Sequence, residues 1–398
     1  MLLKVKNIFI LVLIAACGFS SWKAYIYFFD NKAPEITLIG IKDCGHYCGS
    51  LQCAISGNKK GLISIWLDDK PLMRKFKIES TTKEYPFIIP TRTISNGKHA
   101  LKMGFTDNTY QKNKSEKELT FYVDNIPPQA AFLKADSEFK VFQGRTLHIQ
   151  FQVNKKIKEA KINALSNTYE CFPESKNSSI YETFIPINCE EAPNEYLLVA
   201  EIKDYVGNVL NFENKFQIIK FPFKKQILKI TSEKVKKEKE LGHIQDQLEI
   251  QLKQLTQKSP KEKLWKGQFC TPIDIIRSTC DFGTVRTTQQ KGKYIHRAVD
   301  ILNEPKSVVW ASQNGIVAIK DRYEESGNTV VIDHGWGITS MYFHLEDFAN
   351  IKVGDRIRKG NPVGTLGKTG YATGYHLHWE LRVNNVAVDP LQWVKATF

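Results

Sequence analysis

The stretches Ile295-His-Arg-Ala-Val-Asp300 and Gly374-Tyr-His-Leu-His-Trp-Glu-Leu381 decide how the C-terminal third of the chain folds. Alternate side chains of an extended strand point to the same face, so polar and apolar residues separate onto opposite faces. If the first stretch is extended, one of its faces carries His296, Ala298 and Asp300. An imidazole and a carboxylate then lie side by side.

The second stretch alternates in the same way, with His376, His378 and Glu380 on one face and apolar residues facing a core. Ligands from two neighbouring strands can meet at one metal ion. Two imidazoles, one carboxylate and a position open to water are the usual arrangement of catalytic zinc. A residue between two ligands on one face must be small, and Ala298 meets that condition.

Glycines punctuate short apolar runs throughout residues 264–398, which predicts an all-β domain with many tight turns. A third histidine, His344, lies between the two stretches. No serine or cysteine triad competes convincingly, because the isolated thiols lack a framing histidine and carboxylate. The two histidine stretches are therefore the candidate site of this domain.

Residues from about Trp265 to Trp393 resemble the lysostaphin-type zinc endopeptidases, which cut peptide bonds in bacterial cell-wall peptidoglycan. The resemblance covers about a third of the chain. Its motifs follow in order: Cys280-Asp-Phe-Gly283 before Arg286, His296 to Asp300, Val309-Trp-Ala311 with Asn314-Gly315, Gly327 to Gly335, Met341-Tyr-Phe-His-Leu345, Val353-Gly354 with Lys359-Gly360, Gly364 to Gly370, Gly374 to Glu380, and Val388-Asp-Pro390.

The resemblance implies one Zn²⁺ per chain, held by His296, Asp300 and His378. It also implies that His344 and His376 stand beside the zinc-bound water, as general base or as stabilisers of the oxyanion. The residues do not divide these two roles.

Several positions near the motifs need separate interpretation. Tyr294 is a weaker candidate for an oxyanion donor, whereas Asp333 and His334 are expected to hold a turn. The family usually has glycine where this chain has Ala298, and the added methyl group is small enough that we expect zinc to bind. The segment Asn303-Glu-Pro-Lys-Ser307 lacks the usual glycine turn.

Residues 33–221 consist of short β-branched and aromatic runs divided by turn residues. Similar phrases recur about 95 residues apart, which is the size of an immunoglobulin-type sandwich. Leu101 to Asp107, for example, recurs in kind at Leu198 to Asp204. We expect two Ig-like β-sandwiches, at 33–125 and 126–221, with one irregular β domain as the alternative.

Residues 224–260 change to a helical period, with Leu241, Ile244, Leu248 and Leu255 on one stripe and Leu252 beside it. Ser259-Pro260 ends the helix. We expect a helical linker that positions, and covers, the catalytic groove.

Residues 1–30 are typical of an export signal, because Lys4 and Lys6 precede a long apolar run. A helix from Ile8 to Phe29 would be about 33 Å long, enough to span a membrane. An uncleaved signal anchor is favoured. A lipoprotein signal ending at Cys17 and a cleaved secretory peptide are the alternatives, and all three export the rest of the chain.

The other seven cysteines fit an oxidising compartment. Two disulfides are predicted, Cys171 with Cys189 and Cys270 with Cys280. Cys44, Cys48 and Cys53 leave one thiol over, or form a metal site with His46, which would need a fourth ligand.

The chain has 398 residues and a net charge of +14, so it fits several domains and an anionic partner. Much of the excess lies in Lys224 to Lys266, where twelve lysines face six acidic residues without interleaved aromatics, so nucleic-acid binding is not expected. The sequence predicts a mainly β, multidomain zinc metalloendopeptidase of the bacterial envelope, membrane-anchored and acting on peptidoglycan. The alternatives are a non-catalytic regulator of a wall hydrolase or divisome protein, and an adaptor that binds envelope proteins through its Ig-like modules.

Overall fold

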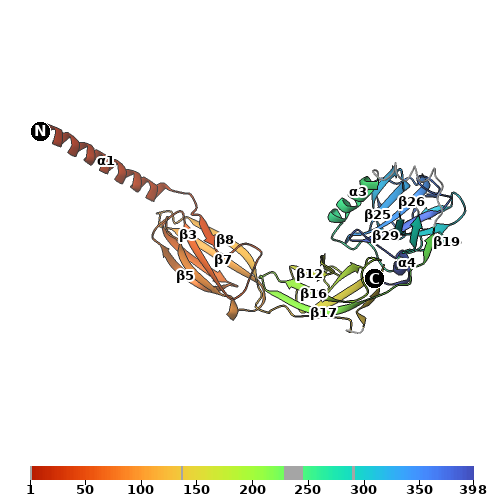
Figure 1. Ribbon diagram of the computed structural model, residues 1–398. Helices are drawn as coiled ribbons and strands as arrows, with labels where there is room; N and C mark the ends of the chain where they lie inside the picture. Colours follow the sequence, from red (N-terminus) through yellow and green to blue (C-terminus); the bar gives the residue numbers. More distant parts are fainter. Residues whose placement is uncertain (1, 136–137, 228–244, 289–291) are drawn as a thin grey trace. The chain divides into compact units, whose positions relative to one another are not determined.

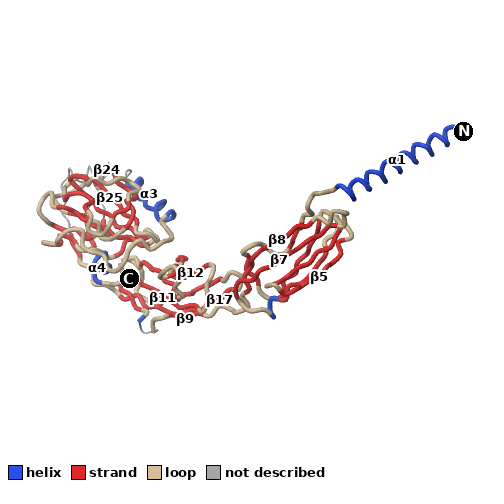
Figure 2. Tube along the Cα trace, turned by 180° about the vertical axis from the view of Figure 1, so that it is seen from behind, coloured by secondary structure: helices blue, strands red, loops and turns tan. Residues whose placement is uncertain are grey.

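The computed structural model describes residues 2–135, 138–227, 245–288 and 292–398. Strands are the dominant regular structure of these residues (Figure 2). The chain divides into two compact units, one of residues 1–127 with 204–208 and the other of residues 128–203 with 209–398. The predicted mainly β, multidomain class is confirmed.

The first unit begins with helix α1 (Leu2–Phe29) and continues as two packed sheets. One sheet has the order β1-β3-β6 and the other β2-β8-β7-β4-β5. The elements are β1 (Ile36–Ile39), β2 (Gly45–Tyr47), β3 (Ser50–Gly57), β4 (Gly61–Leu67), β5 (Lys70–Ile78), β6 (Tyr85–Pro90), the short 3₁₀ helix η1 (Thr91–Thr93), β7 (Gly97–Asp107) and β8 (Lys114–Val123). Every second residue of β7 is buried, so its alternation supplies one wall of the core.

In the described part of the chain, no helix has both the length and the apolar character needed to cross a membrane. The predicted membrane segment is therefore not confirmed and stays a prediction.

The second unit begins with another pair of sheets, of order β10-β17-β16-β12-β13 and β14-β15-β11-β9. Their strands are β9 (Ala130–Phe132), β10 (Lys140–Phe142), β11 (Thr146–Val153), β12 (Glu159–Ala164), β13 (Asn167–Glu170), β14 (Phe172–Pro173), β15 (Ile180–Pro186), β16 (Glu195–Lys203) and β17 (Val209–Ile219). Phe139, Phe151 and Phe216 are buried in the core between these sheets. Two-layered β domains thus occupy the region for which Ig-like sandwiches are predicted, and the Ig-like assignment itself stays a prediction.

The C-terminal part of the second unit is built on one large sheet. Its main path is β19-β22-β29-β26-β25-β24-β27, to which β23, β28 and β30 are attached. The strands are β19 (Arg277–Cys280), β22 (Val299–Leu302), β23 (Val308–Trp310), β24 (Gly315–Tyr323), β25 (Gly327–Asp333), β26 (Ile338–Phe348), β27 (Arg356–Ile357), β28 (Pro362–Leu366), β29 (Leu377–Val383) and β30 (Val386–Val388). All these pairings are antiparallel.

Three further elements border this sheet. A small sheet of order β18-β20-β21 is formed by β18 (Lys225–Ile227), β20 (Val285–Thr288) and β21 (Gly292–Ile295). Helix α3 (Gln245–Lys258) lies along the large sheet beside β25 (Figure 1). Helix α4 (Pro390–Lys395) begins at Asp389, whose side chain accepts a hydrogen bond from the Leu391 amide.

Helix α3 is the described end of the predicted helical linker, since residues 228–244, including Leu241 and Ile244, lie outside the described residues. Leu248 and Leu252 are buried and Leu255 packs beside them. The predicted stripe places Leu248 and Leu255 in line with Leu252 beside them, so the buried face is turned slightly toward Leu252. The helix ends at Lys258, immediately before Ser259-Pro260.

An aromatic cluster joins the second β domain to the C-terminal domain within the second unit. Phe184 of β15 lies with Trp265, Trp336 and Trp393 in one buried group. The side chain of Lys263 runs among these rings, and its amino group donates to the buried carboxylate of Glu182 at 2.7 Å.

The structure contradicts both predicted disulfides, because all eight cysteines are free thiols. Cys171 is buried in the core of the second β domain, whereas Cys189 belongs to the core of the C-terminal domain. Cys270 Sγ faces the carbonyl oxygens of Ala311 and Ser312, whereas Cys280 lies beside Asp300. Closeness in the sequence predicts these two pairs, but in the fold the two cysteines of each pair have different neighbours.

The remaining thiols are also unpaired, so the predicted bridge among Cys44, Cys48 and Cys53 is wrong as well. Cys53 is buried in the core of the first unit, whereas Cys44 and Cys48 are exposed.

Candidate metal centre

One row of residues crosses the large sheet at the predicted site. Asp300 of β22 lies opposite His378 of β29 on one side and Cys280 of β19 on the other. His378 in turn lies opposite Phe343 of β26. Directly opposed residues of antiparallel strands project from the same face, so these four side chains share one surface of the sheet.

His296 reaches this surface from a loop. It precedes β22, and its backbone is fixed by hydrogen bonds from its amide to the Thr284 carbonyl at 2.9 Å and from the Gly283 amide to its own carbonyl at 2.8 Å. The expectation that His296 and Asp300 share a face by simple strand alternation is therefore wrong, since β22 begins only at Val299. The two side chains meet because the loop turns His296 back toward the sheet.

The side chain of Asp300 is the centre of the cluster. Its Oδ1 atom lies 2.9 Å from His378 Nδ1, 3.1 Å from His296 Nε2 and 3.9 Å from His376 Nε2. Its Oδ2 atom lies 3.5 Å from a guanidinium nitrogen of Arg286. Three histidines thus direct a ring nitrogen toward one carboxylate oxygen.

Burial and charge act in opposite directions on these groups. Burial raises the pKa of Asp300, but the adjacent imidazoles of His296 and His378 outweigh burial and hold that pKa well below its usual range. Burial lowers the pKa of His378, yet the hydrogen bond to Asp300 and the nearby Glu380 raise it to about 9. Burial dominates at His296, whose pKa is lowered. The cluster is a water-poor place in which a carboxylate remains ionised.

A divalent cation fits this donor set. His296 is only 6% exposed, and its Nε2 atom has no hydrogen-bond partner, because the contact with Asp300 lacks hydrogen-bonding geometry. A buried ring nitrogen without a partner is costly unless something else accepts its lone pair. Two imidazoles and a carboxylate are ligands that Zn²⁺ takes in hydrolytic sites. Ala298 is fully buried between His296 of the loop and Asp300 of β22, and its side chain is only a methyl group.

Cys280 is an alternative third ligand that the sequence did not indicate. Its Sγ atom and ligand atoms of His296 and Asp300 all lie within 4.8 Å of one another. We favour His378 for two reasons. Its Nδ1 atom and His296 Nε2 face the same oxygen of Asp300, whereas the Cys280 thiol donates weakly to the Asp281 carbonyl and burial raises its pKa.

His344 and His376 stand next to this cluster, with ring centres 4.9 Å apart, and His344 lies 5.9 Å from His378. The Nδ1 atoms of His344 and His376 lie 2.9 Å from the carbonyl oxygens of Thr369 and Gly374. A carbonyl oxygen only accepts, so each Nδ1 carries a proton and Nε2 is the nitrogen that each ring turns away from these carbonyls. Burial, followed by the charges of the neighbouring histidines, lowers the pKa of His344 to about 3.

A β-bulge directs His344 toward the cluster. Strands β25 and β26 pair Val330 with Tyr342 and Asn328 with Leu345, so Phe343 and His344 together oppose one residue. His344 has φ of +60°, a left-handed conformation that is uncommon outside glycine. Without the bulge, alternation would send Phe343 and His344 to opposite faces. Such strain costs about 1–3 kcal/mol and tends to occur at functional sites.

Several residues of the site went unassigned in the sequence. The motif that contains Arg286 assigns it no role, yet Arg286 contacts both His296 and Asp300. The signal for Glu380 was present in its spacing from His378, and Arg382 continues that spacing by two more residues. No sequence pattern pointed to Phe343.

Other residues near the motifs lie elsewhere. His334 is fully buried at the far end of β25, where its ring contacts the Asn314 carbonyl and the Ser340 hydroxyl. Asp333 accepts hydrogen bonds from Ser259 and from the Gly335 amide. Both hold a turn. Tyr294 of β21 lies opposite Arg286 of β20.

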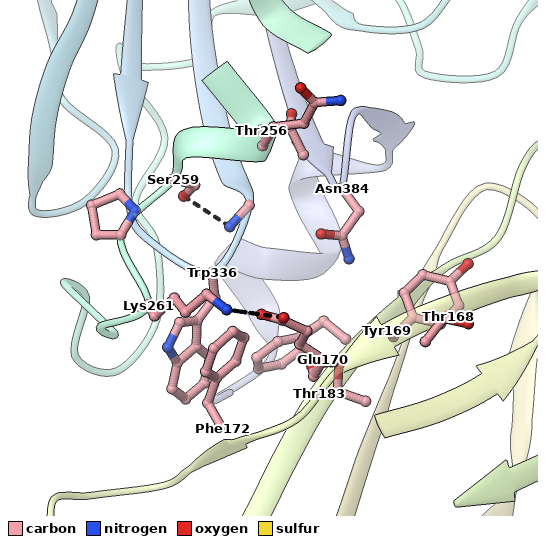
Figure 3. A pocket seen from close by; sticks show the side chains of 14 residues that line it. Thr168, Tyr169, Glu170, Phe172, Thr183, Thr256, Ser259, Lys261, Trp336 and Asn384 are labelled. Carbon is pink, nitrogen blue, oxygen red and sulfur yellow. Dashed lines mark hydrogen bonds and ion pairs between the residues drawn. The ribbon is translucent and has the colours of Figure 1, made fainter. Parts of the chain in front are cut away.

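A separate pocket of about 270 Å³ (Figure 3) is lined by Trp336 and Gly337, just before β26, and by Asn384, just after β29. The stacked rings of Phe172 and Trp336 and the ion pair between Lys261 and Glu170 line it. None of the five predicted site residues lines this pocket, and it offers no grouping of metal ligands.

Comparisons with known proteins agree with this location of the site. The sequence profile of peptidase family M23 matches residues 294–390. The chain is 33% identical over 126 residues to the peptidoglycan DD-endopeptidase ShyC of Vibrio cholerae. It is 35% identical over 127 residues to the DD-carboxypeptidase/endopeptidase Mpg of Neisseria meningitidis. These alignments cover 31% and 32% of this chain and 29% of each relative. The aligned region thus spans less than a third of these relatives.

Solved structures also align with the chain. The catalytic domain of lysostaphin from Staphylococcus simulans is 26% identical with a TM-score of 0.25, covering 36% of this chain and 97% of that one. A zinc-containing peptidase from Vibrio cholerae is 14% identical with a TM-score of 0.29, covering 75% and 81%. Together, the matched profile, the curated relatives and the order of the motifs identify the C-terminal part of this chain as a domain of peptidase family M23.

Proposed function

We propose that the chain is a zinc-dependent endopeptidase that hydrolyses peptide cross-links of bacterial peptidoglycan. The observation that carries the proposal is the arrangement around Asp300, whose Oδ1 atom lies 2.9 Å from His378 Nδ1 and 3.1 Å from the unpartnered His296 Nε2. The family of the domain supports the reaction class. The name of the relative ShyC, a peptidoglycan DD-endopeptidase, supports the substrate.

His296, Asp300 and His378 would hold the ion. When bound, zinc supplies a Lewis acid that makes water nucleophilic near neutral pH and polarises a peptide carbonyl. The protein's part is to fix three ligands and to place His344 and His376 beside them. Arg286 contacts Oδ2 of Asp300, the oxygen that does not face the histidines, and would orient the carboxylate through that contact.

His344 and His376 would handle the protons. Each ring directs its Nδ1–H at a backbone carbonyl, which leaves Nε2 as an acceptor for a proton of the attacking water. After accepting that proton, either ring can hydrogen-bond to the oxyanion or return the proton to the departing amine. The pKa of His344, lowered to about 3, keeps that ring neutral at neutral pH, so its Nε2 lone pair stays available as a hydrogen-bond acceptor.

The remaining parts of the chain fit an envelope enzyme. The export signal would place the β domains and the peptidase domain outside the cytoplasm, attached by the N-terminal segment. The Ig-like modules would act as spacers or contact envelope proteins. The rival function, a non-catalytic regulator, is disfavoured because the three proposed ligands are all present and meet at one point.

Digestion of purified peptidoglycan by the full chain tests the proposal. We expect mass analysis of the released fragments to show cleaved peptide cross-links, with loss of the reaction on adding a chelator and recovery on adding zinc. The control is His376→Ala, which should retain zinc because it removes no proposed ligand. The proposal would be refuted if all released fragments still carried intact peptide cross-links, or if the chelator did not change the amount of fragments released.

A further inference from the structure

Helix α3 packs against the face of the large sheet that carries the metal centre. Leu248 and Leu252 of the helix form one buried cluster with Met341 and Phe343 of β26. Phe343 lies opposite His378 in the ladder between β26 and β29, so both project from this face. The helix therefore covers the sheet immediately beside a proposed zinc ligand.

An aromatic contact connects the helix to that ligand. The ring of Phe343 stacks on the imidazole of His378, with centres 5.2 Å apart and planes 4° from parallel. Phe343 is only 8% exposed and packs in the same cluster as Leu248 and Leu252. Phe343 thus lies between the buried side of α3 and the His378 ring.

A chain of charged groups makes a second connection. His378, Glu380 and Arg382 alternate along β29 and share one face. Glu380 Oε2 lies 3.9 Å from His378 Nε2, and Glu380 Oε1 accepts from Arg382 Nε at 2.5 Å. The two terminal nitrogens of Arg382 each donate to one oxygen of Glu249 on α3, both at 2.7 Å.

Burial makes this chain of charges sensitive to the helix. The side chains of Glu380 and Arg382 are 5% and 7% exposed, so neither charge is stabilised by bulk water. Arg382 also donates to the Asn385 side chain at 3.0 Å, which fixes the position of one nitrogen but adds no charge. The two-pronged contact with Glu249 fixes the plane of the guanidinium group. That plane determines how Arg382 presents its Nε to Glu380.

We propose that α3 is part of the catalytic module, and that Glu249 and Arg382 are positioning residues that hold Glu380, and through it the His378 imidazole, in the metal-binding orientation. This inference rests on the proposed function, because His378 is assigned there as a zinc ligand. Mutation of a residue that hydrogen-bonds to a metal ligand typically lowers metal affinity by about 10–100-fold. Glu249 acts through two further side chains, so an effect near the lower end of that range is expected.

The test compares two single-charge variants of α3 in the full chain. Glu249→Gln keeps the shape of the side chain and removes the charge that faces Arg382. Lys253→Gln is the matched control, because Lys253 lies one turn along the same helix and is exposed. Zinc affinity is measured by competition with a chromogenic chelator, and the ligand geometry by the visible absorption of the cobalt-substituted protein. Hydrolysis of peptidoglycan fragments gives kcat and KM.

Glu249→Gln should weaken zinc binding by about tenfold, change the cobalt spectrum and lower kcat, with KM nearly unchanged. Lys253→Gln should match the wild type in all of these. Suppose that the wild type binds zinc and hydrolyses its substrate, but that the two variants have identical zinc affinities and cobalt spectra. That result would overturn this inference and leave the proposed function standing. A wild type that binds no zinc would overturn both.

Discussion

Replacing Glu182 by alanine tests how the C-terminal domain is held against the second β domain. The Glu182 carboxylate is 1% exposed, and it accepts hydrogen bonds from Lys263 Nζ and His148 Nε2, each at 2.7 Å. The amino group of Lys263 also lies 5.0 Å from the ring centre of Trp265 and 5.4 Å from that of Trp336. Removing the carboxylate leaves this ammonium group among aromatic rings without a counter-charge.

The structure sets the size of the effect. Removing one partner of a buried ion pair costs about 3–5 kcal/mol, because the remaining charge has lost its compensation. The side chain of Lys263 is 18% exposed, so water recovers part of that loss. We therefore expect Glu182→Ala to lower the free energy of unfolding by about 3 kcal/mol. The double variant Glu182→Ala/Lys263→Met should be more stable than Glu182→Ala, because no unpaired charge remains.

The same ion pair predicts a dependence on pH. Burial raises the pKa of Glu182, but the hydrogen bonds from His148 and Lys263 outweigh it, so the pKa lies below its usual 4.5. The unfolded state then binds a proton more readily than the folded state. The contribution of Glu182 to stability is therefore complete above about pH 4.5 and is lost as the pH falls through the folded-state pKa.

Urea unfolding monitored by tryptophan fluorescence measures these differences, since Trp265 and Trp336 lie at this junction. Glu170→Ala is the matched control, because Glu170 pairs with Lys261 at 2.8 Å near the same junction but is 50% exposed. That exposed pair should contribute at most about 1 kcal/mol. If Glu182→Ala and Glu170→Ala changed the unfolding free energy equally, the reasoning from burial would be refuted.

Four other substitutions test the metal centre and its support. Asp300→Ala should abolish zinc binding and turnover together, whereas His376→Ala should keep its zinc and lose turnover; metal analysis beside an activity assay separates these outcomes. Ala298→Val, at a fully buried position, should overpack the loop between the proposed ligands, destabilising the domain by about 1–3 kcal/mol and lowering the zinc content measured by mass spectrometry. Leu252→Ala, at a position of α3 that is only 1% exposed, should lower the unfolding free energy in urea by about 2–5 kcal/mol.

Local patterns predicted the parts of the site that depend on strand alternation. Period-two alternation placed His378 and Glu380 on one face, and it turned Leu377 and Trp379 toward the core, where both are fully buried. The same rule failed at His296, because the strand begins after it. Strand ends are set by hydrogen-bonding partners far away in the sequence, which no local pattern reveals.

Long-range register explains the other differences. Cys280 pairs with Asp300 rather than with Cys270, because β19 aligns against β22 in a register that the spacing of cysteines does not encode. The bulge at His344 likewise depends on how β25 and β26 are aligned. The stripe of Leu248 and Leu252 indicated that α3 packs on a neighbour, but the neighbour, beside His378, emerged only from the fold.

The central claim is that one zinc ion is held by His296, Asp300 and His378. The most direct measurement is a crystal structure of the zinc-loaded protein, with anomalous diffraction recorded on both sides of the zinc absorption edge. We predict a single peak within about 2.0–2.2 Å of His296 Nε2, an oxygen of Asp300 and His378 Nδ1. A peak coordinated by Cys280 in place of His378, or no peak at these side chains, would contradict the claim.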